Sequence, residues 1–318
     1  MAAIYVGADP KSVSMVVTEN SSIKGSSPTK SSQSVHQWAE SPQREASEKN
    51  LWKWNIAMAI LHGIQAIIVL AMGLTNSKLK EFKIPFTTSF TNWDKGYPVP
   101  AVQVYSSMPL VPVTSGFAFM SSIAHIVVLC YWQRYLDDLR RGRNVFRWFE
   151  YAASSSLMIA LIAQLFGIYD VVTLSMIIAC NASMNFFGLL HETTNEASKP
   201  NEVDWSAFIF GCFAGLAPWA AIFAAIAGLP SVSRVPAFVW ALLFVYLFFF
   251  NTFPINMILQ YRNVGWWSDK YWGWSGAGYY QGERVYQILS LVSKSLLLWL
   301  VVGGANQPNE ATGVAAPV

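Results

Sequence analysis

The sequence predicts an all-α membrane protein built as a bundle of seven transmembrane helices. Of its 318 residues, 53% are hydrophobic and only 12% are charged, and the mean hydropathy is +0.34. Soluble domains carry about 25% charged residues, so the composition excludes that class. Beyond residue 50 the chain has seven apolar segments, each near the ~20 residues that a helix needs to cross a bilayer. They lie at 52–74, 109–132, 144–166, 171–190, 206–229, 235–259 and 284–303.

The two ends of the chain differ from this apolar part. Residues 1–50 are polar and rich in Ser, Lys, Glu and Gln, and they lack the pattern of a signal peptide. We expect a disordered cytoplasmic tail there, a seven-helix domain over 51–304, and a short extracellular tail over 305–318.

The connections between the apolar segments also carry information. The first loop, 75–108, contains FKIPFTTSFTNW and YPVPAVQVY, which predict a small β-hairpin. In FFFNTFPIN, Pro254 removes a backbone donor and predicts a kinked helix. The chain has no convincing internal repeat, which argues against a transporter built from inverted halves.

Basic residues are distributed unequally between the two sides of the expected bundle. The side of the N-terminus carries twelve: Arg44, Lys49, Lys53, Arg134, Arg140, Arg141, Arg143, Arg147, Lys199, Arg262, Lys270 and Arg284. The opposite side carries five: Lys78, Lys80, Lys83, Lys95 and Arg234. Because Lys and Arg are enriched in cytoplasmic loops, we predict a cytoplasmic N-terminus and an extracellular C-terminus.

Charge and cysteine content narrow the classes of partner. The net charge of +3 is mild, so no nucleic acid is expected to bind. Cys130, Cys180 and Cys212 lie inside apolar runs without CxxC spacing, which is typical of packing residues rather than of disulfides or metal ligands.

A charged residue, Lys294, lies in the middle of the last apolar segment, within LSLVSKSLLLWLVV. It follows Gly282 by twelve residues, or about 18 Å of helix, which is near the midplane of a ~30 Å apolar core. Glu283, Gln287 and Ser290 share its helical face, so we expect that face to point into the bundle. A charge at this depth costs roughly 2.5 kcal/mol or more and is usually functional.

Glu150, in RWFEYAASSSLM, is the carboxylate that lies clearly inside a predicted span. A desolvated, neutral lysine is a good nucleophile toward an aldehyde, and the resulting imine needs a counter-ion when it is protonated. Two other interpretations stay open. Lys294 and Glu150 form a purely structural ion pair, or Arg147 pairs with Glu150 and leaves Lys294 beside a cavity.

Two histidines, His62 and His125, also fall at depth in the predicted spans. A metal or haem site between helices is one interpretation, but no local spacing motif accompanies these residues. Hydrogen-bonded polar roles are therefore favoured, and no metal site is predicted.

The stretch RWFEYAASSSLM together with GERVYQILSLVSKSLLLW resembles the heliorhodopsins, an inverted family of seven-helix, retinal-binding microbial rhodopsins. The resemblance covers all seven segments, from about residue 50 to 303, and includes the orientation that the basic residues indicate independently. It implies a rhodopsin-like bundle in which Lys294 holds all-trans retinal as a protonated Schiff base and Glu150 is the counter-ion. Ser290, four residues before the lysine, stands where ordinary microbial rhodopsins carry a second carboxylate.

The same resemblance implies further site residues. Positions of the retinal pocket match Ser155, Met158, Asn181, Met184 and Gly188. Polar positions around a cytoplasmic-half cavity, expected to accept a proton, match His62, Gln65, Ser121, His125, Asn144 and Trp148. The hairpin of the first loop is expected to serve contacts in a homodimer.

The resemblance favours light sensing over ion pumping. Three turns after Glu150 the chain has Leu161 rather than a carboxylate, so an internal proton donor is missing, and Asp170 is expected to be a helix terminus. We therefore expect a multi-pass photoreceptor, not an enzyme, with a slow photocycle and a cytoplasmic signalling partner or bound lipid. The alternatives are a light-gated proton or ion channel, and a seven-helix receptor or transporter without pigment.

Overall fold

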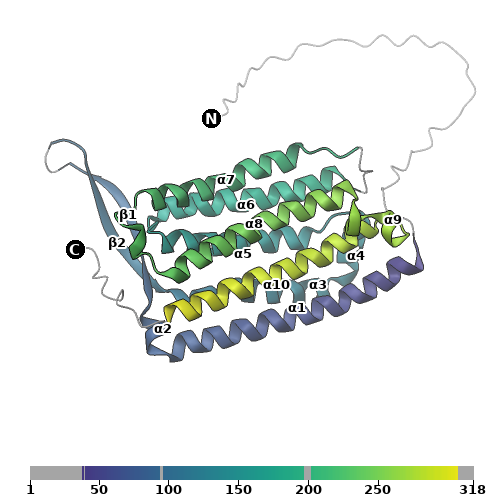
Figure 1. Cartoon of the computed structure of the whole chain (residues 1–318), viewed down its shortest axis with the longest axis horizontal. Coiled ribbons are helices and arrows are strands. Elements are labelled where there is room, and N and C mark those ends of the chain that lie inside the picture. Colours follow the sequence, from purple (N-terminus) through teal and green to yellow (C-terminus); the bar gives the residue numbers. More distant parts are fainter. Residues whose placement is uncertain (1–37, 39, 94–95, 197–201, 307–318) are drawn as a thin grey trace, which may run out of the picture. The chain divides into compact units, whose positions relative to one another are not determined.

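Seven long helices form the protein in the computed structural model, which describes residues 38, 40–93, 96–196 and 202–306 (Figure 1). They are α1 (Pro42–Thr75), α3 (Leu110–Cys130), α5 (Val145–Leu165), α6 (Val171–Thr194), α7 (Ser206–Ala227), α8 (Ala237–Arg262) and α10 (Ala277–Ala305). Short helices between them are α2 (Ser77–Glu81), α4 (Trp132–Arg140), α9 (Asp269–Trp272), η1 (Val232–Arg234) and η2 (Gly265–Trp267). Each long helix coincides with one of the seven apolar segments, so the predicted fold class is confirmed.

Six of these helices are long and apolar enough to cross a membrane by length and composition, and α5 differs from them. It carries Arg147, Glu150 and three consecutive serines from Ser154, and 13 of its 21 residues are buried. It packs mainly against α3 and α6. The polar content of α5 therefore faces other helices rather than lipid, which is where a membrane bundle tolerates it.

The first helix begins earlier than its apolar pattern indicates. Ser41 caps α1, its Oγ accepting from the backbone N of Arg44 at 3.1 Å, and Pro42 occupies the first turn. Both are strong helix-start signals, so residues 42–50 are helical although their polarity assigned them to the tail. The rest of the expected tails, at 1–37, 39 and 307–318, lies outside the described residues.

The hairpin of the first loop is confirmed. Strand β1 (Lys83–Asn92) pairs antiparallel with β2 (Val99–Pro109), with a register shift between Phe86 and Thr87. The backbone N of Thr87 donates to Tyr169 O at 2.9 Å. This bond fixes β1 to the connection between α5 and α6.

Asp170 strengthens the same junction. Its carboxylate accepts from Ser89 N of β1 at 3.1 Å and from Thr173 N of α6 at 2.9 Å. Asp170 is therefore the N-cap of α6, which confirms it as a helix terminus.

Packing brings the last helix next to the first. Helix α10 packs on α8 along one side and on α1 and α3 along others, and Figure 1 shows it beside α1. Pro254, where we expect a kink, lies within α8, which continues to Arg262. Consequently the middle of α10 faces the polar middle of α5 from inside the bundle.

Candidate functional site

Lys294 and Glu150 form a buried ion pair between α10 and α5. Lys294 Nζ lies 2.6 Å from Glu150 Oε1, and both side chains are more than nine-tenths buried. Nζ also donates to Ser290 Oγ, one turn earlier, at 2.9 Å. Ser121 Oγ of α3 donates to the same Glu150 oxygen at 2.7 Å. Each charge thus has an opposite charge and a hydroxyl partner, as burial of ions requires.

Arg147 does not pair with Glu150. Its guanidinium forms ion pairs with Glu192 of α6 and Glu283 of α10. One turn of helix separates the two side chains on α5, and they point to different neighbours. The interpretation in which Arg147 neutralises Glu150 is therefore wrong.

An apolar cavity of about 240 Å³ ends at Lys294. It lies among α5, α6, α7, α8 and α10, and eight of its 23 lining residues are aromatic. Those that the sequence analysis missed are Tyr151, Phe208, Tyr246, Phe249, Phe250, Phe253 and Tyr286. No periodic signal distinguishes these rings from ordinary core aromatics, because α8 is apolar on nearly every face. The cavity can therefore hold an apolar ligand next to a single amine, that of Lys294.

The residues expected to form the pocket mostly do line this cavity. Ser155, Met158, Met184 and Gly188 are in its wall. Asn181 lies behind the wall and donates from Nδ2 to Ser155 Oγ at 2.7 Å.

Gly188 has a steric requirement. A Cβ built at this position would lie 2.3 Å from the ring of Trp148. The absence of a side chain on α6 therefore lets the indole lie flat along the cavity wall.

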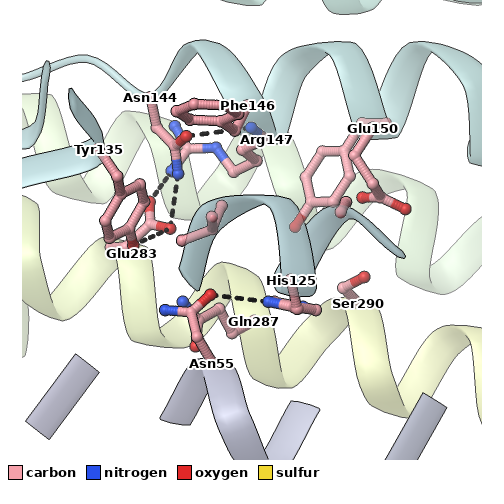
Figure 2. A pocket seen from close by; sticks show the side chains of 13 residues that line it. Asn55, His125, Tyr135, Asn144, Phe146, Arg147, Glu150, Glu283, Gln287 and Ser290 are labelled. Carbon is pink, nitrogen blue, oxygen red and sulfur yellow. Dashed lines mark hydrogen bonds and ion pairs between the residues drawn. The ribbon is translucent and has the colours of Figure 1, made fainter. Parts of the chain in front are cut away.

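A second, small cavity of about 30 Å³ adjoins the ion pair (Figure 2). Glu150 and Ser290 lie at one end, while His125 and Asn144 also line it. His125 Nδ1 is hydrogen-bonded to Asn55 Oδ1 at 2.8 Å. Such a volume holds one or two water molecules, and its lining offers the polar partners they need.

The other members of the expected polar cluster are spread over three places. His62 is buried and stacks on His125 with ring centroids 5.9 Å apart. Gln65 is half-buried away from the cavity and accepts from Trp299 Nε1 at 3.2 Å. Trp148 lines the large apolar cavity instead. The structure thus brings His62, His125 and Ser121 together near Glu150, and separates Gln65 and Trp148 from them.

No metal-binding group accompanies the histidine pair. Within the described ranges, no three His, Cys, Asp or Glu side chains are close enough to hold an ion.

Sequence reasoning missed the charge cluster of Arg147, Glu192 and Glu283. Arg147 and Glu283 line the small cavity, and Figure 2 shows Glu283 on the side opposite Glu150 and Ser290. Asn144 Nδ2 donates to Glu283 Oε1 at 2.7 Å, and Trp148 Nε1 donates to Glu192 Oε2 at 2.6 Å. Both glutamates lie near helix ends, where charged residues are usually exposed to solvent, so the sequence alone does not indicate that they are buried. The one sequence signal for a buried Glu283 was its position on the same helical face as Lys294.

Comparisons with known proteins agree with this architecture. A family model described as Heliorhodopsin matches residues 51–305. Among solved structures, a cyanorhodopsin from the cyanobacterium Tolypothrix sp. NIES-4075 is similar, with a TM-score of 0.50 and 12% identity over 84% of this chain and 100% of that one. At this identity the likeness shows the fold alone, a rhodopsin-like bundle. No curated protein matches the chain. Because the family match spans well over half of the sequence, the chain belongs to the heliorhodopsin family.

Proposed function

We propose that this protein is a light sensor that binds all-trans retinal covalently through Lys294 as a protonated Schiff base, with Glu150 as the counter-ion. The position of Lys294 carries the proposal, since its Nζ lies where an apolar cavity of about 240 Å³ meets a carboxylate 2.6 Å away. The amine suits an aldehyde, and the aromatic walls suit an apolar polyene. When bound, retinal supplies light absorption and photoisomerisation.

The chain's own residues control the proton at Lys294 Nζ. Glu150 Oε1 is close enough to exchange a proton with it, and Ser121 and Ser290 orient the two groups. The small cavity beside Glu150 offers water and His125 as further acceptors. A proton that leaves Nζ therefore has several acceptors close to the lysine.

The far end of that small cavity supports sensing over pumping. There Arg147 is held by Glu192 and Glu283, and the three charges form a closed cluster between α5, α6 and α10. Both glutamates are held in ion pairs with Arg147, so neither is a free proton acceptor, and Leu161 offers no donor on the opposite side. We infer that the proton returns by the route it took, in a slow cycle that signals to a cytoplasmic partner.

Reconstitution with retinal tests the proposal. Purified protein mixed with all-trans retinal is expected to gain a visible absorption band that hydroxylamine bleaches in the light. Lys294→Ala and Lys294→Arg should stay colourless, because neither side chain forms the imine. Lys270→Ala, which removes an exposed lysine from the short helix α9, serves as the control and should keep the band. A visible band in Lys294→Ala would exclude this attachment site.

A light-gated proton channel is the second candidate, favoured by the small polar cavity that already reaches Glu150 from one side. Electrical recording with matched solutions separates the classes. A sensor gives no sustained photocurrent, whereas a channel gives a current that reverses with voltage. Sustained current at zero voltage would mean a pump and would refute both candidates.

A further inference from the structure

Arg284, near the start of α10, has no carboxylate partner among the described residues. Its Nη2 donates to Ser47 Oγ of α1 at 3.0 Å, and its Nη1 donates to Gln281 Oε1 at 3.4 Å. Its Nε is buried and has no hydrogen-bond partner in the described part of the chain. The preceding residue, Glu283, is on another face of the helix and pairs with Arg147.

Arg284 shares this lack of a carboxylate partner with Arg141 in the described part of the chain, but it differs from four other arginines at the same end of the bundle. Arg44, Arg140, Arg143 and Arg147 each form an ion pair with a carboxylate. A half-buried guanidinium without a counter-charge is unfavourable, and its planar donors match the oxygens of a phosphate group. The missing anion is therefore expected to come from outside the chain.

An apolar stripe continues from Arg284 along α10. Ile288, Val292 and Leu296 follow at helical spacing, and all three are exposed on the surface of the bundle. The stripe ends at Trp299, whose Nε1 donates to Gln65 of α1 at 3.2 Å. From Arg284 to Trp299 is about 22 Å of helix, which is close to the length of one extended fatty acyl chain.

The stripe runs along the seam where α10 packs against α1 (Figure 1). Ser47 touches Arg284 at one end of this seam, and Gln65 touches Trp299 at the other. At the edge of these two membrane-spanning helices, a polar contact that matches a lipid headgroup therefore lies next to an apolar surface about as long as one acyl chain.

We propose that this seam binds one anionic phospholipid, with its phosphate on Arg284 and one acyl chain along Ile288, Val292 and Leu296. The guanidinium Nη atoms of Arg284 and the Ser47 hydroxyl that contacts them are the donors to the phosphate. An uncompensated arginine favours a headgroup of net negative charge over a zwitterionic one. Anionic lipids are concentrated in cytoplasmic leaflets, which agrees with the side that the basic residues indicate.

Native mass spectrometry of the full chain tests the site. The protein is released from nanodiscs that contain equal amounts of phosphatidylglycerol and phosphatidylcholine. Wild type is expected to retain one phosphatidylglycerol with about fivefold preference, the effect of one cation at a membrane surface. Arg284→Gln should abolish that preference, while Arg262→Gln, an exposed arginine at the end of α8, should keep it. Unchanged preference in Arg284→Gln would overturn the proposal.

Two further arms identify the ligand and guard against a folding defect. Ile288→Trp leaves the charge intact at an exposed position but fills the seam, so retained phosphatidylglycerol should decrease. Equal retention in Ile288→Trp and wild type would refute binding of the acyl chain here.

In thermal unfolding, phosphatidylglycerol should raise the Tm of wild type, whereas inorganic phosphate should not. Equal stabilisation by phosphate would mean a simple anion site, and a lipid-free dimer would mean that a second copy covers the seam.

Discussion

Two groups of buried charge adjoin the small cavity. Lys294 and Glu150 are one group, and Arg147 with Glu192 and Glu283 is the other. The small cavity lies between them, lined by residues of both. Because no side chain in the described part of the chain forms a hydrogen bond or ion pair with members of both groups, a change of charge at Lys294 is expected to leave the partners of Arg147 in place. Substitutions in one group are therefore expected to act locally.

Replacing Glu150 by Gln removes the carboxylate next to the lysine nitrogen but keeps the size of the side chain. A counter-ion stabilises a positive charge beside it, so its loss should move the visible band to longer wavelength wherever the pigment stays protonated. The absorption spectrum measures this shift. Ser121→Ala, which removes only a hydrogen bond to Glu150, should shift the band less. An unmoved band in the Gln variant would assign the counter-ion to another group.

Adding one methyl group at Gly188 should disturb the cavity strongly. The new Cβ would overlap the ring of Trp148, which must move and lose its 2.6 Å bond to Glu192. We expect Gly188→Ala to lower the yield of pigment and to cost about 1–3 kcal/mol of stability, as overpacking does. Gly303→Ala is the matched control, because nothing lies within 4 Å of its Cβ. Similar pigment yield and Tm in both variants would contradict this role of Gly188.

Among the secondary-structure elements, the hairpin and α6 depend on one carboxylate. Asp170 accepts hydrogen bonds from the backbone and hydroxyl of Thr173 and from Ser89 of β1, and these bonds lower the pKa of its carboxyl group. The folded protein therefore stabilises the ionised form of Asp170 more than the unfolded chain does. This makes the junction between hairpin and helix sensitive to acid.

The acid sensitivity has a defined direction. Above the ordinary carboxyl pKa of about 4, Asp170 is ionised in both states and its contribution is complete. As the pH falls below that value and through the lowered folded pKa, the contribution is lost. Hydrogen exchange of the segment 83–92 should therefore lose protection between about pH 4 and pH 2 in wild type. Asp170→Asn, which still caps a helix but carries no charge, should show no such step, and a step in that variant would locate the titration elsewhere.

The same elements show how far a sequence can predict this fold. Hydropathy and length identify all seven helices, and clusters of β-branched and aromatic residues identify the hairpin. Helix ends are less certain, because α1 continues through the polar residues 42–50, of which only Arg44, Ser47 and Glu48 are buried against other helices. For the site, the family motif and the shared helical face indicate Lys294 and Glu150. Their hydroxyl partners are Ser290, one turn earlier on α10, and Ser121 on the neighbouring helix α3. Glu192 and the aromatic walls from α7 and α8 needed the packing of distant segments, which no local pattern encodes.

The whole molecule has two unlike ends. The buried arginines and the two connections that contain α4 and α9 lie at one end, and the hairpin lies at the other (Figure 1). Most basic residues are on the side of the first end. We propose that this side is cytoplasmic, following the preference of Lys and Arg for cytoplasmic loops.

Epitope labelling in intact cells tests that orientation. A tag after residue 10 should be labelled only after the cells are permeabilised, whereas a tag after residue 310 should be labelled without that treatment. The opposite result would reverse the orientation and place the Arg284 seam in the outer leaflet. A tag in the β1–β2 turn, next to residue 96, gives an internal check because it should behave like the C-terminal one.

Helix α10 contributes a member to both groups of buried charge, and it follows the other six long helices in the chain, so the ribosome makes it after them. Until it enters the membrane, Glu150 lacks Lys294, and Arg147 lacks one of its two glutamates. The six long helices before α10 therefore enter the bilayer with Glu150 unpaired, whereas Arg147 already has Glu192 as a partner. Insertion of α10 is thus a required step of assembly, since a chain that stops before residue 277 keeps the carboxylate of Glu150 in its interior without a counter-charge.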